Sequence, residues 1–389
     1  MNILIVYNRN IDVDDAGASR TTIELANYLA EKKEVKVFVA FKILNGNKGK
    51  VVECPIDTNN RINEYRRLIN VNNIDCIIVP ESEKLTSVVS EAIDNKNVTI
   101  ISALHSRPGY ERIRNNIPYK ITLRSGKSVY RKLRALIHLI LSPWYNYKLS
   151  NKLFKILRKS YELSDAFVLL SERYKNIFVN TYKIKDNGKK LYAIANGLSF
   201  NDIIIDDLIY KKKSKTCLVV GRLDEKSKRL SLLLKMWPSI EKRFPDWRLQ
   251  IVGTGESEQY YKYLTRKYKI KNVVFEGQQN PLPYYMKAKV FFMTSAYEGF
   301  PMTILEALQT GCVPIVMDTF EAIHDVITDC EDGCIIKDES MFVERASLLM
   351  NDESLLRKMA FKGIKNCKRF ERVNIYEKYY SLIKRIGNN

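Results

Sequence analysis

The chain has 389 residues, 46% of them hydrophobic and 28% charged, and a formal charge of +20 at pH 7. The length suits two or three domains, and the ordinary hydrophobic fraction excludes a disordered or collagen-like chain. The excess of basic residues predicts an anionic partner: a nucleic acid, an acidic membrane surface or a phosphate-bearing substrate.

Short β-branched runs alternate along the chain with segments of helical period. The predicted strands of the first half are 3–7, 35–40, 75–79, 98–102, 166–170 and 191–194. Those of the second half are 216–220, 248–252, 273–275, 290–293, 313–316 and 334–336. Such nearly continuous apolar strands, separated by helices, are typical of parallel sheets that are buried on both faces.

This alternation predicts an α/β fold with two doubly wound, Rossmann-like domains, residues 1–200 and 201–371. A predicted helix at 372–389 follows and needs a surface to pack on, for which the first domain is the candidate. The boundary falls in the polar segment 198–215, which we interpret as a solvated linker. Because open α/β sheets bind ligands at the carboxyl ends of their strands, we expect a cleft between the domains.

Most of the positive charge lies in one segment, residues 107–160, of the first predicted domain. Residues 1–106 carry 13 Lys and Arg against 14 Asp and Glu, whereas residues 107–160 carry 14 against the single acid Glu111. The segment mixes these cations with bulky apolar residues and contains Trp144 and Tyr147. A basic amphipathic helix with such aromatic residues is typical of a membrane interface. We therefore expect an anionic membrane surface as a partner, and two solvated helices are the simpler alternative.

Cysteine usage and hydropathy restrict the class of protein further. The chain has 7 Cys, no Cys-x-x-Cys pair and only 3 His, which favours reduced thiols over a zinc site. The apolar start of the chain is too short for a signal peptide, and no run of about 18 apolar residues occurs. These features predict a cytoplasmic protein that is soluble or peripheral at the membrane.

The most informative motif contains two Glu residues, Glu298 and Glu306, around a predicted helix start. Pro301 suits the first turn of a helix and Gly311 suits its end. Free N–H groups at residues 299–302 would favour a phosphate, and the two carboxylates can reach both ends of a nucleotide-sugar. A capped helix with one exposed Glu has the same spacing, and the spacing alone favours that simpler alternative.

Three further loops follow predicted strands. Gly221 allows a tight exit from a strand, and Arg222 with Lys228 can hold a diphosphate from two sides, although the acids nearby also suit an ordinary polar loop. Gly17 lies in a turn of small residues where a backbone can approach a ligand. A Gly-Thr-Gly run ending at Gly255 has Glu258 where a dinucleotide fingerprint needs its third glycine, which argues against an NAD enzyme.

Taken in order, these segments resemble the retaining GT-B glycosyltransferases of the family 4 type. The resemblance rests on the Ala-Gly-Ala-Ser-Arg turn that ends at Arg20, on Gly221-Arg222-Leu223, and on two Glu separated by seven residues, Glu298 and Glu306. The first loop departs from the family pattern, because Ala16 replaces the first residue of the usual Gly-Gly pair. The resemblance implies a GT-B fold, with two Rossmann-like domains facing a cleft.

The resemblance also implies roles for individual residues. Glu298 corresponds to the catalytic residue that contacts the transferred sugar, and His105 falls where a residue near the sugar is often found, with a purely structural histidine an equal alternative. Lys226 competes with Lys228 for the second diphosphate position. The implied donor-binding residues are Gly17, Arg222, Lys228, Gly299, Phe300, Pro301, Met302, Thr303 and Glu306.

The implied reaction moves a hexose or N-acetylhexosamine from a nucleotide-sugar, expected to be UDP-linked, to a lipid-linked or cell-envelope glycan. The expected place is the inner face of the cell membrane, with no metal, no other cofactor and no nucleic-acid partner. The tripeptide Asp12-Val13-Asp14 resembles the metal motif of the other glycosyltransferase fold, and we interpret it as a solvated turn. A basic nucleic-acid-binding protein and a GT-B-like sugar-nucleotide epimerase or phosphorylase are the alternatives.

Overall fold

The chain folds into two compact units. The computed structural model describes residues 1–12, 17–44, 49–94, 97–110, 129–186, 188–200 and 203–387. The first unit comprises Met1–Arg112, Tyr147–Gly197 and Phe370–Asn389, and the second comprises Ile113–Asn146 and Leu198–Arg369.

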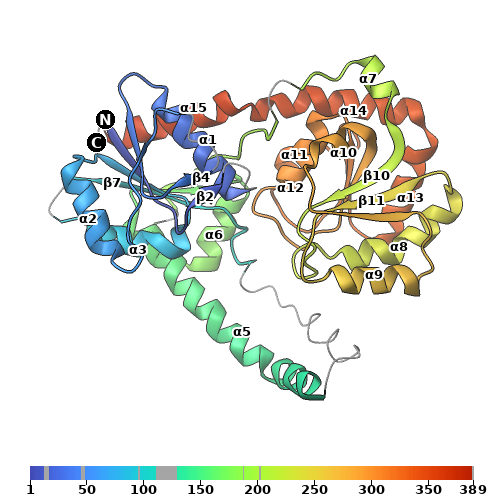
Figure 1. Cartoon of the computed structure of the whole chain (residues 1–389), viewed down its shortest axis with the longest axis horizontal. Helices are drawn as coiled ribbons and strands as arrows, with labels where there is room; N and C mark the ends of the chain where they lie inside the picture. Colours follow the sequence, from blue (N-terminus) through green and yellow to red (C-terminus); the bar gives the residue numbers. More distant parts are fainter. Residues whose placement is uncertain are drawn as a thin grey trace. The chain divides into compact units, whose positions relative to one another are not determined.

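A parallel sheet in the order β5-β3-β1-β6-β7-β8-β9 organises the first unit (Figure 1). Its strands are β1 (Asn2–Ile5), β3 (Lys36–Val39), β5 (Val52–Glu53), β6 (Cys76–Val79), β7 (Thr99–Leu104), β8 (Ala166–Leu169) and β9 (Leu191–Ala193). Every residue of β6 and β8 is buried. Because successive side chains point to opposite faces, both faces of the sheet are covered.

The six strands predicted for the first half of the chain are confirmed. The strand β5 and a small pair formed by β2 (Ile11–Asp12) and β4 (Ile43–Leu44) were not predicted, because two residues show no periodicity. The helices between the strands are α1 (Ala18–Ala30), α2 (Arg61–Val71), α3 (Ser82–Ala92), α5 (Val129–Leu163) and α6 (Tyr174–Tyr182).

A second parallel sheet, in the order β12-β11-β10-β13-β14-β15, organises the second unit. Its strands are β10 (Ser214–Val220), β11 (Arg248–Val252), β12 (Val273–Gly277), β13 (Ala288–Met293), β14 (Val313–Met317) and β15 (Cys334–Ile336). The flanking helices are α7 (Asp207–Lys211), α8 (Leu230–Arg243), α9 (Glu258–Lys267), α10 (Leu282–Lys287), α11 (Met302–Gln309), α12 (Ile323–Val326), α13 (Glu339–Asn351) and α14 (Glu353–Cys367). All six strands predicted for the second half are confirmed, and with them the doubly wound α/β fold.

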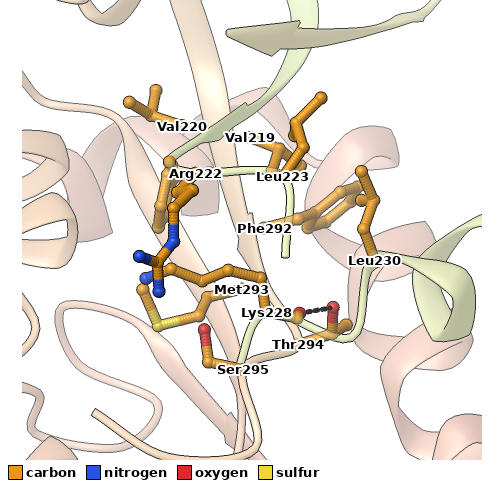
Figure 2. Close-up of a pocket in the computed structure, with 12 residues that line it drawn as sticks. Val219, Val220, Arg222, Leu223, Lys228, Leu230, Phe292, Met293, Thr294 and Ser295 are labelled. Atoms are coloured by element: carbon orange, nitrogen blue, oxygen red, sulfur yellow. Dashed lines mark hydrogen bonds between the residues drawn. The ribbon is translucent and has the colours of Figure 1, made fainter. Parts of the chain in front are cut away.

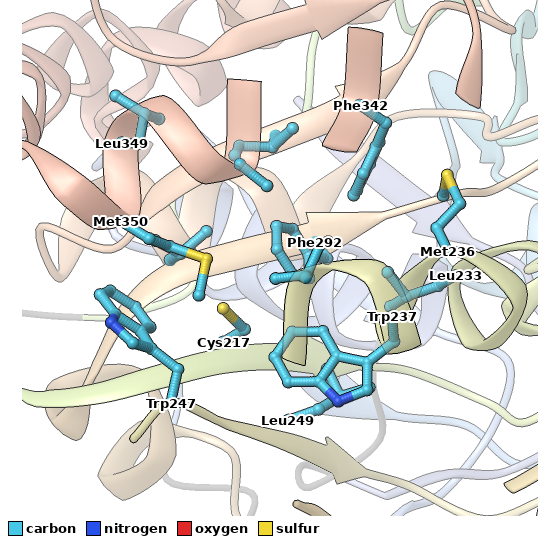
Figure 3. Packing of buried hydrophobic residues seen from close by; sticks show 14 of the residues in the cluster. Cys217, Leu233, Met236, Trp237, Trp247, Leu249, Phe292, Phe342, Leu349 and Met350 are labelled. Atoms are coloured by element: carbon cyan, nitrogen blue, oxygen red, sulfur yellow. The ribbon is translucent and has the colours of Figure 1, made fainter. Parts of the chain in front are cut away.

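Large aromatic side chains fill the core of the second unit (Figure 3). Trp237 of α8 and Phe292 of β13 are at most 1% exposed, and the Phe292 ring lies 5.0 Å from that of Phe342 on α13. Each such side chain buries 150–250 Å² and contributes heavily to stability. This packing holds β13 and its helices in place and so positions the segments that follow the strand.

The segment 198–215 is not the solvated linker that its composition predicts. Its described part includes the helix α7 and the start of β10, and Lys213 is only 5% exposed. The Lys213 ammonium donates 2.8 Å hydrogen bonds to the carbonyls of Tyr285 and Ala288 at the end of α10. Burial lowers the pKa of Lys213 to about 8. The clustered Lys residues suggested solvent, but one of them is a buried helix cap.

The C-terminal helix α15 (Arg372–Gly387) packs on α1 in the first unit (Figure 1). Glu24 of α1 accepts a hydrogen bond of 2.7 Å from the Tyr376 hydroxyl and pairs with Arg372 at 2.9 Å. Just after the end of α1, Lys32 pairs with Glu377 of α15 at 2.7 Å. Burial raises the pKa of Glu24, and the Arg372 guanidinium opposes that effect.

The motif Ala-Asn-Gly at 195–197 is explained by the same contact. A Cβ atom on Gly197 would lie 3.2 Å from the Cα of Arg372. The turn after β9 therefore needs a glycine because the first residue of α15 packs directly against it. In the part of the chain that the structure describes, no helix is long and apolar enough to cross a membrane.

Replacing Arg372 by Met tests the partly buried pair with Glu24 that joins α15 to α1. The variant keeps the aliphatic stem but removes the charge beside Glu24, so we expect a loss of about 2 kcal/mol in unfolding free energy. Because the pKa of Glu24 is already raised, and rises further without Arg372, the folded variant binds a proton more readily than the unfolded chain. The deficit should therefore shrink as the pH falls from about 7.5 to about 5, measured by urea unfolding.

Lys384→Met is the matched control. Lys384 pairs with Glu34, and the two side chains are 49% and 60% exposed. Exposed pairs contribute at most about 1 kcal/mol, so this variant should lose much less stability. Equal losses in the two variants would contradict a special role for the buried pair.

Candidate functional site

A pocket lies at the carboxyl ends of the central strands of the second sheet. The strands β10 and β13 are parallel neighbours, with Cys217 opposite Val290, so the segments that follow them leave the same edge. The pocket is lined by residues 219–223, Lys228, Leu230 and residues 291–295. Figure 2 shows the Arg222 and Lys228 side chains directed to the same side of this pocket.

Buried acids organise the loop after β10. The side chain of Asp224 accepts a hydrogen bond of 2.8 Å from Ser227 Oγ and one of 2.9 Å from the backbone N–H of Lys226. Glu225 is 1% exposed and accepts from the backbone N–H of Ser231, and burial raises its pKa. These acids are therefore structural, and the ordinary polar surface loop left open in the sequence analysis is wrong for them.

Hydrogen bonds also tie this loop to the segment after β13. The Thr294 hydroxyl donates to the carbonyls of Lys228 and Arg229 at 3.2 and 3.1 Å, and Arg229 Nε donates back to the Thr294 carbonyl at 3.0 Å. The backbone N–H of Ala296 donates to the Ser227 carbonyl at 2.7 Å. The two segments therefore form one connected rim of the pocket.

The Lys228 ammonium lies 2.6 Å from a carboxylate oxygen of Glu298. The two side chains are 24% and 15% exposed, so the pair is partly desolvated. The Lys228 stem passes over Gly221, where a Cβ atom would lie 3.4 Å from Lys228 Cε. The sequence analysis gave these residues separate roles, and the structure brings them into direct contact.

The other two cations of the loop are more exposed. The Arg222 side chain is 73% exposed and lies 3.4 Å from Asp224 at the mouth of the pocket. Lys226 is exposed and is not part of the pocket lining. This arrangement favours Lys228 over Lys226 as the second cation of the site.

Glu306 lies on α11 and is 5% exposed. Its carboxylate accepts a hydrogen bond of 2.6 Å from Ser199 Oγ. One turn along the helix, the Gln309 side chain bonds the backbone N–H and carbonyl of Phe200 at 3.3 and 3.0 Å. The sequence analysis missed Ser199 and Gln309, because the contacts join segments more than 100 residues apart and no spacing rule reaches that far.

The N-terminus of α11 differs from the prediction in one respect. Pro301 precedes the helix with φ −83° and ψ 74°, and the Met302 N–H donates to the Phe300 carbonyl at 2.9 Å. This is an inverse γ-turn, which uses one of the N–H groups that we expected to be free for a phosphate. Among the described residues, the N–H groups of Gly299 and Thr303 have no intramolecular acceptor.

The glycines of the Gly-Thr-Gly run serve the packing of two loops. A Cβ atom on Gly253 would lie 2.1 Å from the Gly221 carbonyl oxygen, and one on Gly255 would lie 2.4 Å from the Leu223 carbonyl oxygen. Backbone hydrogen bonds join the loops, from Gly221 N to Val252 O at 3.0 Å and from Leu223 N to Thr254 O at 2.8 Å. Only glycine permits this approach, so the run positions Arg222 rather than forming a dinucleotide fingerprint.

Two candidate residues, Gly17 and His105, lie in the first unit. Gly17 has φ +68° at the start of α1, and no atom of the described residues lies within 4 Å of a Cβ built there. His105 follows β7 and lines a pocket with Thr22, Asn196 and Tyr379. Burial lowers the pKa of His105 to about 4, and its Nδ1 has no hydrogen-bond partner within the described structure.

The structure describes no cluster of three His, Cys, Asp or Glu side chains that could hold a metal ion, within the residue ranges given above. Asp12 ends the short strand β2, and the rest of the tripeptide, Val13 and Asp14, lies outside the described residues. Asp15 and Ala16 of the first loop lie outside them as well.

The pocket and its loops lie in a segment of the chain that matches a sequence-family model. Residues 201–366 match the model described as glycosyl transferases group 1. The HepE protein of Anabaena, solved in complex with UDP, has a TM-score of 0.73 and 14% identity, covering 99% of this chain and 100% of that chain. That likeness extends over both units and shows the GT-B fold.

Curated proteins of known sequence match about half of the chain. An uncharacterized glycosyltransferase of Haemophilus influenzae is 28% identical over 229 residues, which is 57% of this chain and 63% of that protein. The UDP-Gal:alpha-D-GlcNAc-diphosphoundecaprenol alpha-1,3-galactosyltransferase of Escherichia coli is 30% identical over 202 residues, which is 50% of this chain and 51% of that enzyme. The chain thus spans between half and two thirds of the length of these relatives.

Gly253→Ala tests the contact that positions the Arg222 loop. The new methyl group would overlap the Gly221 carbonyl oxygen, so the loops must move apart, and we expect a loss of about 3 kcal/mol in the stability of the second unit. Gly277→Ala is the matched control, since Gly277 also has a positive φ, +73°, but open space around it. The control should lose about 1 kcal/mol, from backbone strain alone. Similar unfolding midpoints for the two variants would contradict the role of the close approach.

Proposed function

We propose that this chain is a retaining glycosyltransferase that moves a hexose or N-acetylhexosamine from a UDP-sugar to a lipid-linked or cell-envelope glycan. The observation that carries the proposal is that Arg222 and Lys228 line one pocket, with Glu298 paired to Lys228, in a segment that matches the group 1 model. Glu306 lies on the helix that follows Glu298. The similar proteins support the choice of donor and acceptor. HepE was solved with UDP, and the E. coli enzyme is named for a diphosphoundecaprenol-linked acceptor.

The proposed chemistry follows from where charge develops. When the bond from the sugar to the nucleoside diphosphate breaks, the sugar gains oxocarbenium character and negative charge builds on the departing diphosphate. Fixed cations beside that diphosphate stabilise the transition state more than the ground state. Arg222, at the mouth of the pocket, and Lys228, inside it, are proposed to supply this charge. In this proposal the reaction uses protein cations and no metal or other cofactor.

The carboxylates are proposed to bind the two ends of the donor. Glu298 contacts the transferred sugar, and Glu306 accepts hydrogen bonds from the ribose hydroxyls. The Ser199 hydroxyl already bonds one oxygen of Glu306, which fixes the orientation of the carboxylate before the nucleotide arrives. The segment from Gly299 to Thr303, with Phe300, Pro301 and Met302 between them, forms the wall beside the phosphates, and the N–H groups of Gly299 and Thr303 are its available donors.

The residues of the first unit have proposed roles as well. The open backbone at Gly17 allows a close approach to the donor. His105 has a pKa lowered to about 4, so its imidazole is neutral near pH 7 and suits a hydrogen bond to a sugar hydroxyl. We place the enzyme in the cytoplasm, peripheral at the inner face of the cell membrane, where a lipid-linked acceptor would be found.

Donor turnover in solution tests the proposal. The wild-type protein, supplied with a panel of nucleotide-sugars, should consume one of them, and NMR of the product should show that the anomeric configuration is retained. Arg222→Ala and Glu306→Gln should each lower turnover by roughly 100-fold, the effect of losing one group that stabilises developing charge or positions the donor. Arg266→Ala, an exposed cation on α9, is the matched control and should keep full activity.

The fold of these variants must be checked by their unfolding midpoints, which should be close to wild type for the exposed Arg222. Unchanged turnover in both the Arg222 and the Glu306 variants would contradict the assignment of the site. Conversion of a free sugar nucleotide into its epimer, without an acceptor, would instead support the epimerase alternative.

Glu298→Gln separates binding of the nucleotide from transfer of the sugar. In the structure Lys228 is paired with Glu298, so a bound diphosphate has to compete with this carboxylate for the ammonium. Removing the charge of Glu298 should tighten binding of free UDP several-fold, measured by calorimetry, while sugar transfer falls by at least tenfold. Glu256→Gln, at an exposed carboxylate of the neighbouring loop, is the control and should change neither quantity. Weaker UDP binding to Glu298→Gln would show that the pair does not compete with the diphosphate.

A further inference from the structure

Residues 198–200, at the start of a segment of the second unit, are hydrogen-bonded to the helix α11. Ser199 is 7% exposed, and its hydroxyl donates the 2.6 Å bond to the Glu306 carboxylate. The next residue, Phe200, is bonded to the side chain of Gln309. Residues three apart on a helix are neighbours on its surface, so two successive residues of the segment contact two neighbouring residues of α11.

Gln309 fixes the backbone of Phe200 in two directions. A glutamine side chain has one carbonyl acceptor and an amide donor, so it can bond both the N–H and the carbonyl of a single residue. The Phe200 ring lies 6.1 Å from the Tyr285 ring, edge to face, and the Tyr285 hydroxyl donates to the Thr303 carbonyl at 3.1 Å. Because Thr303 is on α11, these contacts join Phe200 to the same helix by a second route.

The backbone of Glu306 is held as well. Thr310 is fully buried, and its hydroxyl donates to the carbonyls of Glu306 and Ala307 at 2.9 and 3.0 Å. Burying a carboxylate is costly unless hydrogen bonds compensate for the lost water, and the Ser199 hydroxyl supplies one such bond. Both the backbone and the carboxylate of Glu306 are therefore held before a ligand binds.

We propose that Ser199 and Gln309 are positioning residues that make the site specific for a ribonucleotide. Ser199 holds the Glu306 carboxylate in one orientation. Gln309 holds Ser199 in place through the backbone of Phe200. The inference rests on the proposed function, in which Glu306 accepts hydrogen bonds from the ribose hydroxyls. A carboxylate can accept about four hydrogen bonds, so the bond from Ser199 is compatible with two from the ribose.

The orientation of the carboxylate matters because the 2′ and 3′ hydroxyls lie on adjacent atoms of a rigid ring. A carboxylate can bond both of them only in a narrow range of orientations, since hydrogen bonds weaken steeply as they bend. A Glu306 side chain that rotated freely would also lose that freedom when the nucleotide binds. Fixing the carboxylate beforehand therefore raises affinity most for a ligand that has both hydroxyls.

The simpler alternative is that these contacts only stabilise the packing of residues 198–200 on α11. A purely structural role would change the binding of all nucleotides to the same extent. A positioning role changes the preference for a nucleotide with a 2′ hydroxyl over one without it. Comparing UDP with 2′-deoxy-UDP therefore separates the two.

Calorimetry on the full chain measures this preference. The wild-type protein should bind UDP at least roughly tenfold more tightly than 2′-deoxy-UDP, the effect of one hydrogen bond to a charged group. Ser199→Ala should weaken UDP binding roughly tenfold and 2′-deoxy-UDP binding at most about threefold, so that most of the preference is lost. Ser199→Thr keeps a hydroxyl at this position and should keep the preference.

Gln309→Met tests the indirect part of the inference. The variant keeps the length of the side chain but removes both bonds to Phe200, so the preference for UDP should fall here too. Combining it with Ser199→Ala should cause little further loss, because both residues act through Glu306. The matched control is Ser347→Ala, on α13, where the Ser347 hydroxyl donates to the Val343 carbonyl at 2.7 Å and does not line the pocket. The control should leave the affinity for both nucleotides unchanged.

Turnover gives a second readout. With the nucleotide-sugar that the wild-type protein consumes, Ser199→Ala should raise KM roughly tenfold and change kcat at most about twofold, since the ribose contact is the same in the ground state and the transition state. Equal weakening of UDP and 2′-deoxy-UDP in Ser199→Ala, or tighter binding of UDP, would overturn the inference.

Glu306→Gln distinguishes failure of this inference from failure of the proposed function. If Glu306→Gln loses the preference for UDP while Ser199→Ala keeps it, the positioning role is wrong and the proposed role of Glu306 stands. If Glu306→Gln keeps the preference, or if the wild-type protein shows none, the proposed ribose contact is wrong and the inference fails with it.

Discussion

The close approach of two backbone loops at the edge of the second sheet determines the position of the candidate site. Gly253 packs so tightly on the Gly221 carbonyl that no side chain fits between them. Backbone hydrogen bonds from Gly221 to Val252 and from Leu223 to Thr254 join the two loops beside this contact. This contact fixes the path of the loop after β10. It therefore sets the positions of Arg222, at the start of the loop, and of Lys228, which lines the pocket. The Thr294 hydroxyl then connects the loop to the neighbouring strand end. The chemistry of the site therefore depends on two residues that carry no functional group.

The charged groups of the pocket differ in how they are held. Arg222 is exposed and has one long contact, so it can move to a ligand at small cost. Lys228 is partly buried and paired with Glu298, and Glu306 is nearly inaccessible and bonded to Ser199. These partners offset part of the desolvation free energy of each charge, which would otherwise destabilise the fold. In the proposed function, an anionic donor therefore meets the exposed Arg222 first and exchanges partners with the Lys228–Glu298 pair afterwards.

Much of the fold could be predicted from the sequence, because parallel strands buried on both faces appear as short, continuous apolar runs. All twelve predicted strands occur, and only strands of two residues were missed. The sequence named Glu298 and Lys228 as candidates but gave no sign of their contact, since it joins loops 70 residues apart. Ser199 and the buried Lys213 were missed for a related reason: a hydroxyl and an ammonium in polar segments suggest solvent, and only the tertiary structure supplies their buried partners.

The net charge of the chain does not come from the pocket. Within the second unit the cations of the site have acids beside them, Asp224 for Arg222 and Glu298 for Lys228, so the unliganded pocket adds almost nothing to the total. On α5, Arg158 pairs with Glu162 at 3.0 Å. Paired charges produce a short-range field and unpaired charges a long-range one, which salt screens beyond about 8–10 Å. The paired charges of the pocket therefore suit a small anion that enters it and exchanges ion pairs, as the proposed donor diphosphate would.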